Sequence, residues 1–100
     1  MATLRRRMEI TNGLGLHLRA ASQFAQVSRN FQAEVWLSCN GRAADGRSIL
    51  DLMTLAAECG TPLELEVSGP EAAEATAALC ALIEGRFNED EEGRGKRPGP

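Results

Sequence analysis

The sequence has no long run of apolar side chains and contains few cysteines. A helix that crosses a bilayer needs about 20 consecutive apolar residues, and the arginines at 5–7 are followed by polar residues rather than by the apolar block of a signal peptide. We therefore expect a cytoplasmic protein with no membrane partner. The three cysteines, Cys39, Cys59 and Cys80, are an odd number at a spacing of about 20 residues, which fits a reducing compartment and no metal-ligand pattern. We expect neither disulfides nor a metal site.

The charge balance narrows the class of partners. Lys and Arg number 11 against 14 Asp and Glu, for a net charge of −3. Proteins that bind nucleic acid need clustered Lys and Arg, and the cluster at 5–7 lies in an expected strand, whose side chains alternate between two faces. We therefore expect no nucleic-acid partner. Apolar residues at 43% and charged residues at 25% are typical of a globular domain. We expect one monomeric domain over 1–87 and a disordered, charged tail over 88–100.

Hydrophobic periodicity predicts seven elements in the order β-α-β-β-α-β-α. Strands that alternate between apolar and polar residues indicate a sheet with one buried and one open face, and Trp36 belongs to the polar side of its strand. We therefore predict an α+β fold, an open-faced two-layer sandwich with a four-stranded antiparallel sheet and three helices on one face. The expected elements are strands over 4–11, 31–38, 43–46 and 62–68, helices over 18–29 and 48–58, a hairpin turn at Asn40-Gly41, and a final helix that starts at 69–71.

His17 lies where a glycine-containing loop meets the helix expected over 18–29. No Ser, Thr, Asp or Asn stands at the expected N-cap, so the first helical N–H groups lack an obvious side-chain acceptor. Such groups attract anions, and Arg19 adds a guanidinium. A neutral imidazole at this point is a suitable nucleophile toward a phosphoryl group. From the residues alone a second interpretation stays open, in which His17 ends the loop and its ring caps the helix.

The segment 15–21, Gly-Leu-His-Leu-Arg-Ala-Ala, resembles the active-site signature Gly-Leu-His-Ala-Arg-Pro-Ala of HPr, the histidine-containing phosphocarrier family of the sugar phosphotransferase system. A second segment, 46–55, is similar to the regulatory-serine segment of that family. The predicted element order is also the order of the family, and the resemblance covers about residues 6–87. The matching residues of the signature are Gly15, Leu16, His17, Arg19 and Ala21.

The resemblance implies a phosphoryl carrier rather than an enzyme. Phosphoenolpyruvate phosphorylates enzyme I on histidine, enzyme I passes the group to Nδ1 of His17, and His17 passes it to an EIIA-type protein. Arg19 would stabilise the phosphoryl oxygens, and no cofactor is implied. The alternative is a regulatory HPr-like binding module that controls a kinase or a transcription regulator. Retention of both His17 and Arg19 favours the carrier, since a binding module needs neither.

Two residues depart from the family signature. Leu18 replaces a small residue, and Ala20 replaces a proline, which removes a rigid ring and adds an N–H donor. Neither change removes the phosphoryl acceptor. Both lean slightly toward the nitrogen-related branch of the family or an unlinked regulatory homologue, and they point to a change of partner rather than of chemistry.

Ser48 allows a structural and a regulatory interpretation. With Asp51 three residues later, it forms the pattern of a capping box at the start of the helix expected over 48–58. By resemblance, Ser48 is the serine that HPr kinase/phosphorylase phosphorylates. The carboxylate of Asp51 counts against the regulatory role, because it would repel a phosphate. Both roles can hold at once.

The helix over 48–58 has more apolar residues than one buried stripe needs. Leu52, Leu55, Ala56 and Cys59 form that stripe. A helix buried on all sides is one interpretation. We favour a docking patch beside His17 for enzyme I and EIIA, formed by the remaining apolar residues of this helix and by the two signature departures: Leu18, Ala20, Ile49, Leu50 and Met53.

Overall fold

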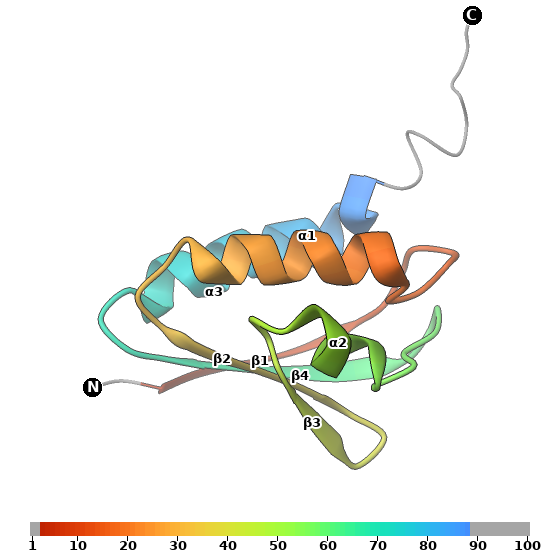
Figure 1. Ribbon diagram of the computed structural model, residues 1–100, viewed down its shortest axis with the longest axis horizontal. Coiled ribbons are helices and arrows are strands. Elements are labelled where there is room, and N and C mark those ends of the chain that lie inside the picture. Colours follow the sequence, from red (N-terminus) through yellow and green to blue (C-terminus); the bar gives the residue numbers. More distant parts are fainter. Residues whose placement is uncertain (1–2, 89–100) are drawn as a thin grey trace, which may run out of the picture.

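The computed structural model describes residues 3–88, which form a sheet covered on one face by helices (Figure 1). The sheet has the order β1-β4-β2-β3, and every pairing is antiparallel. The predicted fold class is confirmed, with three α-helices on one side of a four-stranded sheet. The elements are β1 (Thr3–Glu9), α1 (Leu18–Arg29), β2 (Glu34–Cys39), β3 (Arg42–Asp45), α2 (Ile49–Met53), β4 (Pro62–Ser68), α3 (Ala72–Glu84) and a 3-10 turn, η1 (Arg86–Asn88).

Strand alternation places the core between the sheet and the helices. Val35, Leu37, Leu65 and Val67 of the two central strands point toward the helices and are buried. Phe24 from the middle of α1 fills the space above them and is fully buried. Burial of one such side chain stabilises the folded state by roughly 1.5–3 kcal/mol, so Phe24 helps to hold α1 against the sheet.

The hairpin between β2 and β3 follows the prediction. Asn40 and Gly41 have φ of 53° and 78°, and Cys39 pairs directly with Arg42. Positive φ at both central positions is the requirement of a type I′ turn. The expected strand over 31–38 begins only at Glu34, because the chain up to Ala33 is still turning away from α1; the N–H of Phe31 donates to the carbonyl of Ser28.

The second helix is shorter than the 48–58 that periodicity predicts. It ends at Met53, and Ala56 adopts a positive φ of 50°. Leu52 and Leu55 are buried as expected, whereas Ala56 and Cys59 are exposed, so the predicted four-residue stripe is wrong in its second half. The N–H groups of Leu55 and Ala56 still bond to the last turn of the helix, and the outside contacts begin at the next residue, where the carbonyl of Ala57 accepts from the N–H of Leu16.

The remaining predictions concern the ends and the cysteines. Residues 89–100 of the expected tail lie outside the described residues, and Asn88 belongs to η1. No helix within 3–88 is long and apolar enough to cross a membrane. The described part of the chain holds no cluster of metal-ligating side chains. The thiols of Cys39, Cys59 and Cys80 are free, and burial raises the pKa of Cys39 and of Cys80.

Candidate functional site

A tight loop carries the chain from the end of β1 to the start of α1. The side chain of Asn12 is fully buried, and its Nδ2 donates to the carbonyl oxygen of Gly15 at 2.7 Å. The N–H of Gly15 returns a bond of 3.1 Å to the carbonyl of Asn12, and the N–H of His17 donates to the carbonyl of Gly15 at 3.0 Å. The loop is therefore stabilised by hydrogen bonds between its own residues. Asn12 was expected only as part of this loop; the available signal for its role was a short amide beside a glycine, which favours turns.

Gly15 is the point where this loop rests on the segment after α2. Its φ is 71°, and a β-carbon added there would lie 2.4 Å from the carbonyl oxygen of Ala57 and 2.9 Å from Cα of Glu58. The next residue fixes the contact, because the N–H of Leu16 donates to the carbonyl of Ala57 at 2.8 Å. Leu16 is itself buried. Position 15 thus needs glycine both for its conformation and for the close approach of two backbones.

His17 is the N-cap residue of α1. Its backbone is extended, its side chain makes no capping hydrogen bond, and its carbonyl accepts the first intrahelical bond from the N–H of Ala21 at 2.8 Å. The interpretation in which the ring caps the helix is therefore wrong. The first turn contains no acidic residue. His17 is half-buried and Arg19 is exposed. A helix start without a side-chain cap, flanked by an imidazole and a guanidinium, favours an anion.

Ser48 caps α2, as expected, but only half of the capping box forms. Its Oγ accepts from the N–H of Asp51 at 3.2 Å. The carboxylate of Asp51 does not return to the N–H of Ser48, which donates instead to the carbonyl of Asp45. Oδ2 of Asp51 accepts from the N–H of Asp45 at 2.9 Å. The side chain of Asp51 therefore ties the end of β3 to the start of α2.

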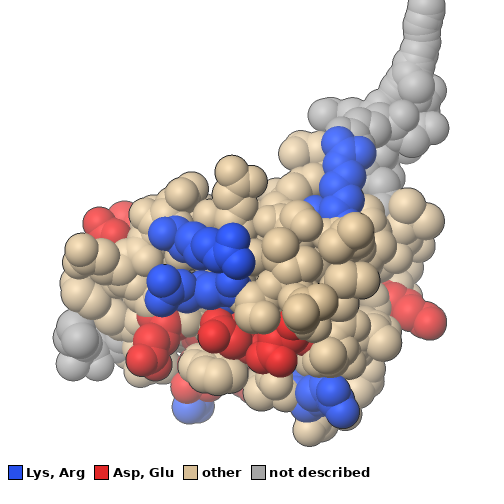
Figure 2. All heavy atoms as spheres, viewed as in Figure 1, with Lys and Arg blue, Asp and Glu red and all other residues tan. Residues whose placement is uncertain are grey.

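Exposed apolar side chains are found on α1, on α2 and in the loop before α1. The helices α1 and α2 pack against each other. Leu18 is 59% exposed, Leu50 80% and Met53 39%. Leu14 is 71% exposed and was not among the expected docking residues. Its place between two glycines fits neither a helical nor a strand pattern of buried residues, and this could have indicated that it is exposed. This side of the molecule is seen in Figure 2, where a broad area of uncharged side chains adjoins the charged clusters.

Two of the expected docking residues do not belong to this group of exposed apolar side chains. Ala20 has no exposed surface, so the prediction that it touches a partner is wrong; it faces the sheet because it stands one turn before Phe24 on the buried side of α1. Ile49 is half-buried and packs against the core. The exposed apolar patch therefore consists of Leu14, Leu18, Leu50 and Met53, and we call it the apolar patch below.

Comparison with known proteins decides the family. A family model described as "PTS HPr component phosphorylation site" matches residues 4–85. The chain belongs to the HPr family of phosphocarrier proteins. Phosphocarrier protein HPr of Neisseria meningitidis is 48% identical over 88% of this chain and 99% of its own length. Phosphocarrier protein NPr of Escherichia coli K12 is 38% identical over 88% of this chain and 99% of its own. A crystal structure of HPr from Thermoanaerobacter tengcongensis, 32% identical, superposes with a TM-score of 0.82 over 85% of this HPr chain and 96% of its own.

Proposed function

We propose that this HPr protein accepts a phosphoryl group from enzyme I on His17 and passes it to an EIIA-type protein. The observation that carries the proposal is the start of α1: His17 stands at the N-cap with no side-chain capping bond and no acidic residue in the first turn. The first N–H groups of such a helix can donate to a phosphoryl oxygen as they would to a capping carboxylate or hydroxyl.

The transfer is a substitution at phosphorus. The lone pair of an imidazole nitrogen of His17, Nδ1 by resemblance to the family, attacks the phosphorus of the phosphohistidine on enzyme I. The new N–P bond forms as the old one breaks, and the electron pair of the old bond returns to the imidazole of enzyme I. Transfer to EIIA repeats the step with His17 as the leaving group. This HPr is therefore a substrate of enzyme I and not an enzyme.

Two sources of positive potential face the transferred group. The helix start supplies main-chain N–H groups and the positive end of its dipole. Arg19, the second residue of α1, supplies a guanidinium that forms bidentate bonds with phosphate oxygens. Arg19 is exposed, which suits a carrier: the group must be held firmly enough to survive between partners and released without a large barrier.

The apolar patch supports the choice of partners. Leu14 and Leu18 flank His17 in the sequence, and Leu50 and Met53 lie on the helix that packs against α1. Apolar anchors around a reactive group allow enzyme I and EIIA to use one surface in turn. Leu18 and Ala20 leaned toward the nitrogen-related branch, but we propose sugar transport as the pathway, because HPr of Neisseria meningitidis shares 48% identity with this chain and NPr of Escherichia coli K12 shares 38%.

The test is phosphorylation in a defined mixture. The protein is incubated with phosphoenolpyruvate and enzyme I, and an acid-labile, base-stable phosphate is measured. His17→Ala should abolish labelling. Arg19→Gln should slow it by roughly tenfold to a hundredfold, whereas Arg29→Gln, at the other end of the same helix, is the matched control and should not. Labelling that survives His17→Ala would refute the proposal.

Ser48 has a structural role that stands without phosphorylation, because it caps α2. A phosphate on its Oγ would break that bond and lie near the carboxylate of Asp51. Regulation at Ser48 therefore stays an expectation from the family. Its test is an acid-stable phosphate formed with ATP and HPr kinase/phosphorylase, which Ser48→Ala must remove.

A further inference from the structure

Trp36 lies on the face of the sheet that the helices leave uncovered. It is the one tryptophan of the chain, and 42% of its surface is exposed. Its neighbours Val35 and Leu37 are buried against the helices, so Trp36 must face the other way. One exposed aromatic side chain is ordinary on a protein surface. Its surroundings decide whether it is more than that.

Three carboxylates surround Trp36 on this open face. Glu66 of β4 and Asp45 of β3 stand directly opposite it in the two strand pairings, a relation that brings β-carbons to about 5 Å. Glu34 precedes it by two positions and so shares its face. Glu34 is exposed, and within residues 3–88 no hydrogen bond or ion pair engages its carboxylate. The indole face and the carboxylates all attract a cation.

Two arginines lie near this group and offset part of its charge. Nη2 of Arg5 lies 3.6 Å from Oε2 of Glu66, so Glu66 already has a partner. Arg47 borders the same region, but its guanidinium makes no ion pair with Glu34 or Asp45 within the described residues. Within residues 3–88 the carboxylate of Asp45 accepts one hydrogen bond, from the main-chain N–H of Arg47 at 2.9 Å. Two carboxylates beside the indole therefore keep their capacity to bind a cation.

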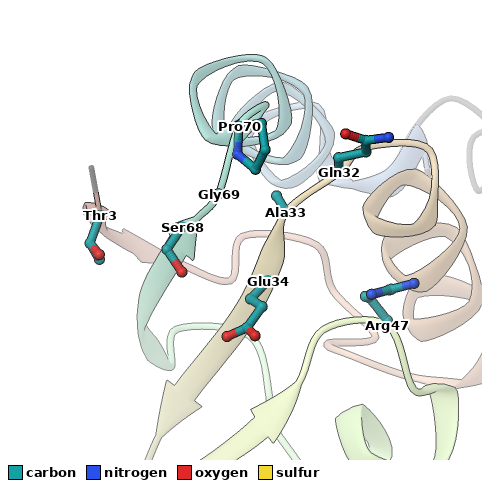
Figure 3. A pocket seen from close by; sticks show the side chains of 8 residues that line it. All are labelled: Thr3, Gln32, Ala33, Glu34, Arg47, Ser68, Gly69 and Pro70. Carbon is teal, nitrogen blue, oxygen red and sulfur yellow. The ribbon is translucent and has the colours of Figure 1, made fainter. Parts of the chain in front are cut away.

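Two adjoining hollows give such a cation a place. The smaller has a volume of about 190 Å³ and is lined by Glu34, Val35, Trp36, Asp45 and Arg47. The larger, of about 570 Å³, shares Glu34 and Arg47 and extends along the ends of β2 and β4 (Figure 3). Figure 3 shows the Glu34 side chain directed away from the helix layer, toward the open face. The smaller hollow can take the end of one long side chain, and the larger can take the chain that carries it.

We propose that Trp36, Glu34 and Asp45 form a docking site for an arginine- or lysine-bearing segment of a partner protein. The cationic side chain stacks on the indole, as guanidinium and ammonium groups do on tryptophan, and its charge meets the two carboxylates. The site lies on the face of the sheet opposite to α1, the helix whose N-cap is His17. It is therefore independent of phosphoryl transfer, and a partner bound there leaves the apolar patch accessible.

The experiment uses Trp36 as its own reporter. The full chain is titrated with the peptide Gly-Arg-Gly-Arg-Gly-Arg, with a version in which citrulline replaces each arginine as the neutral control. The arginine peptide should change the emission of Trp36 in a saturable way that weakens as salt rises. The citrulline peptide should bind at least tenfold more weakly. Equal binding of the two peptides, or no change at millimolar peptide, would overturn the proposal.

Variants locate the binding on the sheet face. Glu34→Gln should weaken binding by roughly threefold to tenfold, whereas Glu84→Gln, an exposed carboxylate on the helix layer, should not change it. Trp36→Leu, followed by anisotropy of a labelled peptide, should weaken binding by roughly tenfold. Equal effects of the two glutamate variants would overturn the proposal. His17→Ala should bind the peptide normally, which separates this test from that of the carrier.

Two other occupants would show themselves in the same titration. A second copy of this chain would raise the molar mass with concentration and shift the emission of Trp36 without peptide. The chain's own basic residues Arg94, Lys96 and Arg97 would compete, so replacing all three by glutamine would shift the emission without peptide and strengthen peptide binding. Either result overturns a site for a partner protein.

Discussion

Replacing Gly15 by alanine should damage the phosphoryl site more than any comparable glycine substitution in this chain. The new β-carbon would lie 2.4 Å from the carbonyl oxygen of Ala57, and the residue would keep a φ of 71°. Both neighbours are backbone, so no side chain can rotate away. The loop must therefore lift from residues 57–58, and the 2.8 Å bond from the N–H of Leu16 to Ala57 is lost.

The expected loss of stability has three parts. A left-handed conformation costs a non-glycine residue roughly 1–2 kcal/mol. Overpacking costs roughly 1–3 kcal/mol, and loss of the Leu16 hydrogen bond roughly 0.5–1.5 kcal/mol. The lower entropy of the unfolded chain offsets about 0.4–1 kcal/mol of this. Gly15→Ala should therefore lower the free energy of unfolding by about 4 kcal/mol, the middle of a range that these contributions set at roughly 1.5–6 kcal/mol. Gly41→Ala is the matched control: its φ is 78°, but nothing lies within 4 Å of the added atom.

The assay is urea unfolding followed by circular dichroism, together with the initial rate of His17 phosphorylation by enzyme I. Gly41→Ala should cost about 1 kcal/mol or less and leave the phosphorylation rate unchanged. Gly15→Ala should lower both quantities, because the same loop sets the position of the N-cap. If the two variants unfold at the same urea concentration, contact with residues 57–58 does not hold the loop and the reasoning fails.

Three further outcomes are expected. Ser48→Ala should lower the free energy of unfolding by about 1 kcal/mol through loss of the α2 cap; an unchanged urea midpoint would contradict this. Ala20→Pro should fold, since proline is tolerated in a first helical turn. The substitution removes an N–H that we expect to contact the phosphoryl group, so it should shift the phosphoryl exchange equilibrium with enzyme I away from the carrier by roughly fivefold. Iodoacetamide at pH 8 should alkylate exposed Cys59 first and Cys39 only after unfolding. Burial raises the folded pKa of Cys39 above its unfolded value, so its contribution to stability is complete below the unfolded pKa and is lost as pH rises through the folded pKa.

Hydrophobic periodicity predicted those helices and strands whose length is set by burial of one face. The alternation around Leu37 and Leu65 placed β2 and β4, and the stripe through Phe24 placed α1. It failed for α2, where the chain stays apolar beyond Met53 although the helix has ended. After Met53 the backbone turns through the positive φ of Ala56, and the carbonyl of Ala57 accepts from Leu16 in the loop before α1; such a backbone contact leaves no mark in the pattern of side chains.

The candidate site was predicted in part for the same reason. His17 and Arg19 are adjacent in sequence and share one helix start, so their relation is local. The apolar patch is not local. Leu14 lies in a loop, and Ala20, which we expected at the docking surface because it departs from the family signature, stands one turn before Phe24 and is fully buried. Whether a single residue at the end of a helix or strand is exposed depends on how the neighbouring layer covers it. Predicting that exposure therefore requires the fold.

The loop before α1 rests on residues that the chain makes much later. Leu16 bonds to the carbonyl of Ala57, and β1 pairs only with β4, so that Glu9 meets Pro62. On the ribosome His17 is made before Ala57 and before β4, so the support of its loop exists only after these have been added. Closing contacts over such long stretches is slow compared with forming a helix. His17 is thus made before the residues on which its loop rests, and the loop reaches its final position only once they are in place.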